Sequence, residues 1–221
     1  KDATGWKNLL KIVNESARSF RFKPRIDYDL LAENSEGLIC LTGCLNGPLL
    51  GYVARADLEP GRIERTIREL QEVADGDKES RFYKMLREYR SLVSKGTIPD
   101  GEFPEPKHSK EFKDFANEWR SLATDGILPK KPSVDAKMNT NADILGEKAR
   151  LRMLDQADAN LARLVDIFGR ENVFAEIMEH GIEFESRALP GVVEIADRHD
   201  VRLVATNDAH YTRAEDSVHH Q

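Results

Sequence analysis

The last third of the chain alternates apolar segments that have the lengths of helices and strands. A stripe at helical spacing comes first, formed by Leu154, Ala157, Leu161, Leu164 and Phe168. A strand is predicted over residues 173–178, a helix over 187–198 with Pro190 in its first turn, and a buried strand over 201–206. Parallel strands need a crossover between them, so this helix–strand–helix–strand order predicts a parallel α/β sheet or barrel.

Residues 1–50 predict one helix, a short helical turn at 27–31 and one further strand. Apolar residues recur at helical spacing within residues 3–17, at Trp6, Leu9, Leu10 and Val13. Thr4 is the predicted N-cap of this helix. The apolar run at 37–42 leads into a loop with Gly43 and Gly47, which indicates a buried strand that ends in a tight turn.

Residues 51–147 have a different character. Three amphipathic stretches fit helical spacing, and they carry Ile63, Ile67, Leu70 and Val73, then Phe82, Met85, Tyr89 and Leu92, then Phe112, Phe115, Trp119 and Leu122. Connectors with Pro and Gly separate these stretches, at 95–106 and 125–133. We therefore divide the chain into a first part, 1–50, a helical insertion, 51–147, and a second part, 148–221.

Composition excludes several classes of function. A net charge of −6 leaves no overall basic footprint for binding nucleic acid. The sequence contains no run of eighteen apolar residues, so no membrane span is predicted. Two cysteines in 221 residues do not make a disulfide framework. The sequence has no Walker loop, GxSxG elbow or dinucleotide fingerprint. A first residue of Lys rather than Met fits a piece of a longer protein, and processing would give the same start.

Polar residues follow the predicted strands at the ends where parallel α/β folds place their active sites. Asn207, Asp208 and His210 come directly after the strand at 201–206. In an extended chain Asp208 and His210 point the same way, so a carboxylate and an imidazole can share zinc or manganese. Alternatively, Asp208 caps the next helix and His210 is an ordinary loop histidine.

Two further clusters follow the other predicted strands. Cys44 lies in the loop after the strand at 37–42, where its thiol either faces a pocket or packs within the loop. Cys40, inside that strand, is a predicted core residue. Glu176 and His180 accompany the strand at 173–178 and can line a site as groups that orient the ligands of a metal. A solvated strand end explains Glu176 and His180 equally well.

Four stretches resemble the PHP domain (polymerase and histidinol phosphatase type) of bacterial- or phage-type DNA polymerase III alpha subunits. They are KDATGWKNLLKIVNESA, SEGLICLTGCLNGPL, IFGRENVFAEIMEHGIE and VRLVATNDAHYTRAED, and they occur in the family's order. The resemblance covers residues 1–50 and 148–221. It implies an α/β fold, a partial distorted (β/α)7 PHP barrel, which the stretch 51–147 interrupts as an α-helical insertion.

By motif, the resemblance implies that Cys44, Asp208 and His210 are metal ligands. His180 matches a family histidine that is not a direct ligand, and Glu176 and Asn207 remain candidates for an orienting role. The family's HxH motif and its other early ligands have no counterpart here and would lie upstream of Lys1. The polymerase palm would lie downstream of Gln221. We therefore expect an internal fragment with an incomplete zinc or manganese site.

The resemblance implies a parent protein that is the catalytic alpha subunit of a replicative DNA polymerase, a Mg-dependent nucleotidyltransferase in the cytoplasm. Its partners would be DNA and other replisome subunits, with no membrane. The PHP domain would support the polymerase structurally and carry a metal-dependent 3′–5′ exonuclease, whereas the fragment alone would be inactive. Two alternatives stay open: a stand-alone PHP phosphoesterase for a small phosphorylated metabolite, and a non-catalytic structural or interaction module.

Overall fold

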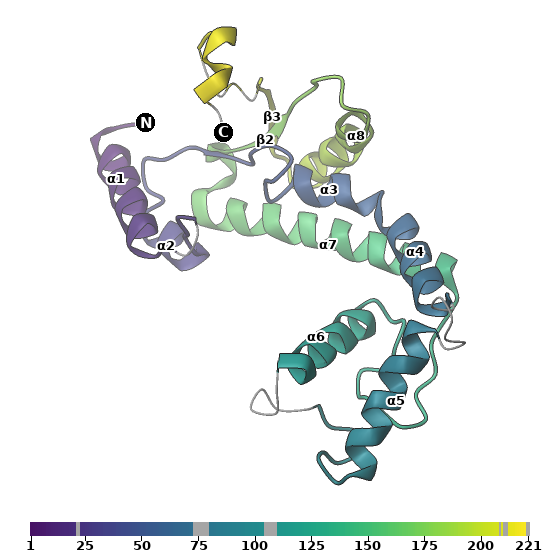
Figure 1. Ribbon diagram of the computed structural model, residues 1–221. Coiled ribbons are helices and arrows are strands. Elements are labelled where there is room, and N and C mark those ends of the chain that lie inside the picture. Colours follow the sequence, from purple (N-terminus) through teal and green to yellow (C-terminus); the bar gives the residue numbers. More distant parts are fainter. Residues whose placement is uncertain (21–22, 73–79, 104–109, 208, 210–211, 220–221) are drawn as a thin grey trace. The chain divides into compact units, whose positions relative to one another are not determined.

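The computed structural model in Figure 1 describes the chain except at residues 21–22, 73–79, 104–109, 208, 210–211 and 220–221. At 110–113, 214, 217 and 219 it describes the backbone alone. The chain divides into two compact units. Unit 1 consists of Lys1–Asp57 and Met153–Gln221, and unit 2 of Leu58–Arg152. The first unit thus combines the two ends of the sequence, and each unit has its own hydrophobic core.

Unit 1 contains a parallel sheet. Its described strands are β1 (Cys40–Leu41), β2 (Val173–Ile177) and β3 (Arg202–Ala205), in the order β1-β2-β3. Leu41 pairs with Phe174, and Ile177 pairs with Ala205. A small parallel sheet within a helix-rich chain confirms the predicted α/β class, while the partial distorted (β/α)7 barrel stays a prediction.

Helices of unit 1 form its core together with the central strand. They are α3 (Leu50–Ala56), α7 (Ala142–Phe168), whose residues from Met153 onward belong to this unit, and α8 (Glu183–Arg198). Buried apolar residues of these helices pack with Val173 and Ala175 of β2. The predicted stripe on α7 is confirmed, since Ala157, Leu161 and Leu164 belong to this core. Unit 1 also contains the first helix of the chain, α1 (Ala3–Arg18), as well as α2 (Tyr28–Glu33) and two 3-10 helices, Arg170–Asn172 and Ala214–His219.

The strand predictions were right in position and partly wrong in burial. β2 is central and buried, as predicted. Leu41 of β1 and Leu203 of β3 are 48% and 38% exposed, so these two strands are not buried as expected. The reason is their position, because each forms an edge of the described sheet and has a neighbouring strand on one side only. Pro190 was also misplaced, since α8 begins at Glu183 and Pro190 lies inside it.

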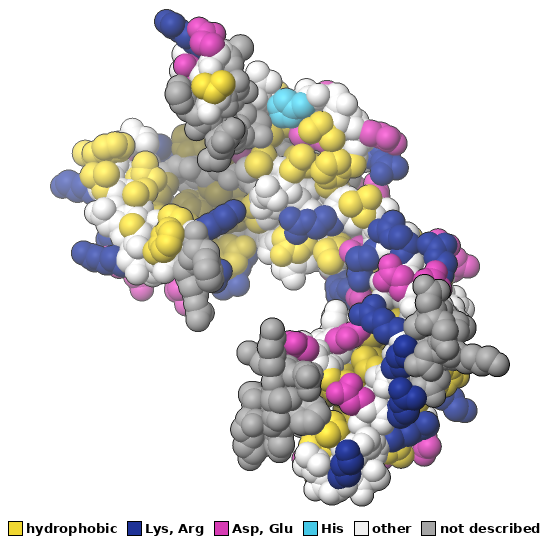
Figure 2. All heavy atoms as spheres, in the orientation of Figure 1, with side chains coloured by type: hydrophobic (Ala, Val, Ile, Leu, Met, Phe, Trp, Pro, Cys, Tyr) yellow, Lys and Arg dark blue, Asp and Glu magenta, His cyan; other side chains and the backbone are white. Residues whose placement is uncertain are grey.

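The first helix, α1 (Ala3–Arg18), is present as predicted, but its capping and burial differ. Asp2 is the N-cap, and its carboxylate accepts a hydrogen bond from the backbone N of Gly5 at 2.9 Å, in place of the predicted Thr4. Ile12 and Gly5 are the buried residues of α1. The apolar stripe identified from the sequence is exposed, with Trp6 at 62%. Hydrophobic side chains are visible over this helix in Figure 2.

Unit 2 is helical among its described residues. The three predicted helices are confirmed as α4 (Glu59–Gln71), α5 (Arg81–Ser94) and α6 (Lys110–Thr124), followed by the first part of α7. An aromatic group lies at the centre of their core, where the rings of Tyr89 and Phe115 stack at 5.9 Å and Trp119 is fully buried. The indole of Trp119 donates to the carbonyl of Pro129 at 2.9 Å, so the buried N–H has a partner.

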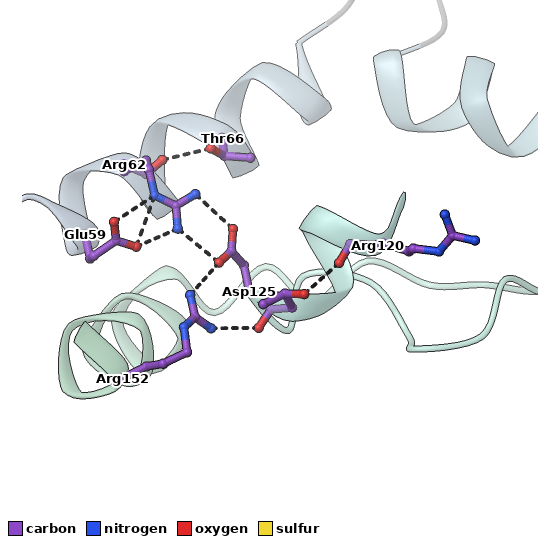
Figure 3. A network of polar contacts seen from close by, with 7 residues as sticks. Glu59, Arg62, Thr66, Arg120, Asp125 and Arg152 are labelled. Atoms are coloured by element: carbon purple, nitrogen blue, oxygen red, sulfur yellow. Dashed lines mark hydrogen bonds and ion pairs between the residues drawn. The ribbon is translucent and has the colours of Figure 1, made fainter. Parts of the chain in front are cut away.

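A network of charged side chains ties the helices of unit 2 together (Figure 3). The guanidinium of Arg62 on α4 donates to both carboxylate oxygens of Asp125, at 2.9 and 3.0 Å, and to Glu59. Arg152 of α7 donates to Asp125 at 2.9 Å. Burial alone would raise the pKa of Asp125, but the hydrogen bonds from Arg62 and Arg152 outweigh burial and lower it. Asp125 therefore joins three helices as a charged group.

Candidate functional site

The carboxyl ends of the three strands lie along one edge of the sheet, which we call the carboxyl edge. Because β1, β2 and β3 are parallel neighbours, the segments that follow Leu41, Ile177 and Ala205 leave the sheet on the same side. The polar clusters predicted from the sequence therefore come from three adjacent strands. In open parallel sheets this edge is the usual place for a ligand site.

Glu176 connects the three strands at the carboxyl edge. Its Oε2 accepts a hydrogen bond from the backbone N of Gly43 at 2.6 Å, and its Oε1 accepts one from the hydroxyl of Thr206 at 2.9 Å. Its own backbone N donates to the hydroxyl of Thr42 at 2.9 Å. Glu176 is 7% exposed, and Thr42 is fully buried. A buried carboxylate with a donor on each oxygen holds the loops after β1 and β3 in a fixed relation.

The loop after β1 places Cys44. Gly43 has φ of 74°, and the backbone N of Gly47 donates to the carbonyl of Cys44 at 2.6 Å to close a turn. A Cβ on Gly47 would clash with the carbonyls of Thr42 and Cys44, so the turn requires glycine there. Cys44 is half-buried and free, and it belongs to the loop that Glu176 anchors.

Cys40 differs from Cys44 in its surroundings. Its side chain packs against the core of unit 1, which confirms the predicted core position. Burial and, secondarily, the nearby Glu176 carboxylate raise the pKa of the Cys40 thiol to about 11. At neutral pH Cys40 is therefore a protonated, weakly nucleophilic thiol, and Cys44 is the better candidate for a metal ligand.

The segment after β3 is described in part. Thr206 donates its backbone N to the carbonyl of Ile177 at 3.1 Å and its hydroxyl to Glu176, which extends the pairing beyond the end of β3. Asn207 is exposed. Asp208 and His210, the two remaining predicted metal ligands, lie outside the described residues, so their role stays a prediction.

His180, the third residue after β2, is paired with a carboxylate that the sequence did not single out. Both oxygens of Glu185 lie within 3.2 Å of His180 Nδ1, and Oε2 also accepts from the His180 backbone N at 3.0 Å. The Glu185 side chain is 1% exposed and that of His180 is 28% exposed. A signal was present in the sequence, because Glu185 shares the buried face of α8 with Ala188 and Val192.

The donor types at the carboxyl edge suit a transition metal. A thiol, carboxylates and imidazoles are the groups that bind zinc, and the imidazoles and carboxylates also suit manganese. Among the residues whose placement is described, no three His, Cys, Asp or Glu side chains converge into a metal-binding group. Cys44, Glu176 and His180 therefore do not make a complete site by themselves, and two predicted ligands fall on undescribed positions.

Comparison with known proteins identifies related sequences. A profile of the PHP domain matches residues 1–84. DNA polymerase III subunit alpha of Treponema pallidum is 26% identical over 219 residues, 99% of this chain and 10% of the relative. The subunit of the same name in Aquifex aeolicus is 24% identical over 221 residues, 100% of this chain and 11% of the relative. An error-prone DNA polymerase of Cutibacterium acnes is 47% identical over 60 residues, 27% of this chain and 5% of the relative.

The three relatives are all named as DNA polymerases, and two of the alignments extend over nearly the whole chain. The alignments with the Treponema and Aquifex subunits span both units, including residues 51–147. The chain covers about a tenth of the length of these two relatives. Of the helices within the described ranges, none is long and apolar enough to cross a membrane.

Proposed function

The chain is a PHP-domain sequence of the type found in DNA polymerase III alpha subunits, and on this premise we propose that it is an internal part of such a subunit. The ratio of lengths supports this proposal, because the aligned relatives are about ten times longer. The parent protein would then be a Mg-dependent replicative DNA polymerase of the cytoplasm. DNA and other replisome subunits would be partners of the parent rather than of this part alone.

Within the parent, the carboxyl edge of unit 1 would contribute to a metal-dependent phosphoesterase site, with 3′–5′ exonuclease action on DNA. The observation that carries this proposal is the Glu176 bridge, which fixes the loops after β1 and β3 next to each other. Cys44 lies in the first loop, and Asp208 and His210 follow the second. These three residues would hold zinc or manganese.

Each protein group has a separate task in this proposal. A bound metal would supply an activated hydroxide and positive charge for phosphodiester hydrolysis. Cys44, Asp208 and His210 would orient that metal at the ends of β1 and β3. Glu176 would keep the two loops at a fixed separation, since both of its oxygens are occupied by donors from those loops. Asn207, which is exposed beside Asp208, is available for a polar contact with substrate.

Metal analysis of the full-length protein and its Asp208→Ala variant tests this proposal. We expect zinc or manganese in the unaltered protein and a lower content in the variant, together with loss of exonuclease activity on a 3′-mismatched primer. Asp197→Ala is the matched control, because Asp197 is an exposed carboxylate on α8 in the same unit. No bound zinc or manganese in the unaltered protein, together with no loss of stability in Asp208→Ala, would favour a purely structural role, whereas equal metal content in the two variants would show that Asp208 is not a ligand.

One observation favours a second candidate, a non-catalytic interaction module. Trp6 and Val13 on α1 are 62% and 53% exposed, and with Leu9 and Leu10 they form an exposed apolar stripe, a feature that is often an interaction surface. A stand-alone phosphoesterase for a small phosphorylated metabolite has less support, because the aligned relatives are polymerases. A reading frame that ends soon after residue 221 would contradict the polymerase assignment.

A further inference from the structure

We propose that one face of α5 in unit 2, together with the connection from α6 to α7 (125–141), binds single-stranded nucleic acid. The groups that would contact the strand are Tyr83 and Arg90 of α5 and Lys137 of the connection. This goes beyond the proposed function, because it concerns the helical unit and not the metal site at the carboxyl edge. A cavity, an exposed aromatic ring beside it and two cations at its rim support the proposal.

The cavity, which we call the α5 cavity, has a volume of about 810 Å³ and lies between α5 and the connection from α6 to α7. Its floor is apolar, since Phe82, Leu86 and Ala136 are buried and belong to the core of unit 2. Pockets that bind small organic groups commonly have volumes of about 300–1,000 Å³. The α5 cavity can therefore receive a nucleobase, and its floor would remove one apolar face of that base from water.

Tyr83 lines the α5 cavity and is mostly exposed. It is 58% exposed, whereas the neighbouring Phe82 is 5% exposed. A tilted contact with the Phe82 ring, with 5.4 Å between the centroids, holds Tyr83 at the rim. Every nucleobase has a flat face that can stack on such a ring, and proteins that bind single strands use exposed aromatic side chains in this way. A duplex keeps its bases stacked inside and would leave Tyr83 uncovered.

Arg90 and Lys137 supply positive charge at the rim of the α5 cavity. Both are exposed, and neither has a carboxylate partner among the residues whose placement the structure describes. The Nε of Arg90 donates to the carbonyl of Val134 at 2.7 Å, which ties the guanidinium to the connection. Its terminal amino groups are then available to an anion, and guanidinium and ammonium groups are the usual ligands of phosphates.

The charge of α5 is used differently on its two sides. The helix has four Lys or Arg residues and one Glu, and Figure 2 shows Lys and Arg side chains gathered over it. Arg81 is paired with Glu118 of α6 and Glu69 of α4, so its charge is balanced within unit 2. At the α5 cavity, Asp135 is the one carboxylate among the described lining residues, against two cations. Asp135 can accept a hydrogen bond from an amino group of a base.

A single strand complements both features of this surface. Its phosphates match the cations, and its unstacked bases match the exposed ring and the apolar floor. An acidic peptide would use the cations alone. The net charge of −6 for the whole chain does not contradict this assignment, because phosphates are contacted by local side chains and not by the average charge.

Fluorescence anisotropy with the whole chain and a labelled oligothymidylate of about 20 nucleotides tests the proposal. EDTA in the buffer removes metal from the proposed site at the carboxyl edge, so a failure of that site does not alter the result. We expect the single strand to bind more tightly than its duplex with oligoadenylate. Tyr83→Ala should weaken binding about 5-fold or more, whereas Tyr83→Phe keeps the ring and should bind like the unaltered chain.

Arg90→Gln and Lys137→Gln test the phosphate contacts. Each should lower the affinity, and each lost contact should reduce the slope of log affinity against log salt concentration by about 0.7. Lys148→Gln is the matched control, because Lys148 is an exposed lysine of α7 that does not line the α5 cavity. It should keep the affinity and the slope of the unaltered chain. Equal urea midpoints would show that the variants lose binding and not their fold.

Photocrosslinking of a strand that contains 5-iodouracil uses the unaltered chain and does not depend on the folding of a variant. We expect mass spectrometry to find the cross-link in the peptide that contains Tyr83. Cross-links confined to unit 1, equal affinity for strand and duplex, or full binding by Tyr83→Ala would each overturn the proposal. Displacement of the strand by poly-glutamate at equal charge would also overturn it, because the surface would then recognise acidic peptides.

Discussion

Glu176 Oε2 lies 2.6 Å from the backbone N of Gly43, a residue far away in the sequence, and this hydrogen bond joins the central strand to the loop that carries Cys44. The other oxygen of the same carboxylate is bound by Thr206. One buried side chain thus organises the carboxyl edge from its middle strand. The arrangement depends on parallel pairing, because only then do the three strand ends meet on one side.

Removal of the Glu176 carboxylate should destabilise unit 1 measurably. We expect Glu176→Ala to lower the free energy of unfolding by about 2 kcal/mol, because the Gly43 N–H and the Thr206 hydroxyl lose a shared buried acceptor. Glu176→Gln should recover most of this loss, since an amide can accept from Gly43 and donate to Thr206. Urea denaturation measures both variants. Equal midpoints for Glu176→Ala and the unaltered chain would show that the bridge is not formed in solution.

Asp125 should make the stability of unit 2 depend on pH. Its hydrogen bonds to Arg62 and Arg152 lower its folded pKa below the unfolded value of about 3.9, so its contribution is complete above that pH. The contribution is lost as pH falls through the folded pKa. We expect Asp125→Ala to cost about 3 kcal/mol near pH 7, less than a fully buried pair because Arg62 is 38% exposed on its side chain.

The measurement for Asp125 is urea denaturation at a series of pH values from neutral to strongly acidic. The difference between Asp125→Ala and the unaltered chain should shrink below about pH 4. Asp135→Ala, an exposed carboxylate in the same unit, is the control and should change stability by less than about 0.5 kcal/mol. A difference that is independent of pH would contradict the assignment of a charged Asp125 to this network.

Two neighbouring residues on α1 should respond very differently to truncation. Ile12 is 6% exposed and Val13 is 53% exposed. Ile12→Ala should therefore cost about 2–4 kcal/mol, whereas Val13→Ala should stay within about 0.5 kcal/mol. Thermal or urea unfolding measures both. Similar losses for the two variants would mean that the apolar stripe of α1 is covered in solution, and this result would favour the interaction module.

The sequence predicted the helices of this structure more accurately than it predicted the burial of the strands. Helices with strong apolar periodicity, such as the one containing Phe82 and Tyr89, were predicted correctly. Spacing identified the buried face of this helix, but the equally regular apolar stripe of α1 is exposed, because burial also requires a neighbouring element to cover the stripe. The burial of Leu41 and Leu203 was predicted wrongly, because an apolar strand sequence does not say whether the strand lies at the centre or the edge of a sheet.

In the candidate site, individual residues could be predicted from the sequence, whereas the contacts between them could not. Cys44 and Glu176 were identified individually from their positions after and within predicted strands, but their link through Gly43 depends on strand order, which the sequence does not state. Glu185 was missed because an acidic residue near a helix N-terminus is expected on general grounds and attracts no attention. Its helical spacing to Ala188 and Val192 was a signal in the sequence, and the structure adds its burial and its distance from His180, which distinguish it from the exposed Glu183.

The two cysteines should differ in their reaction with alkylating reagents. With a pKa of about 11, Cys40 has only about one thousandth of its thiol ionised at pH 8, because burial opposes the charge of the thiolate. We expect iodoacetamide to modify Cys40 in the Cys44→Ser variant at least about 100-fold more slowly than a free thiol of pKa near 8.5. Mass spectrometry after timed quenching measures the rate, and Cys40→Ser reports Cys44 under the same conditions. The rate at Cys40 should rise about tenfold per pH unit up to about pH 11, and a plateau below pH 9 would contradict the buried, protonated thiol.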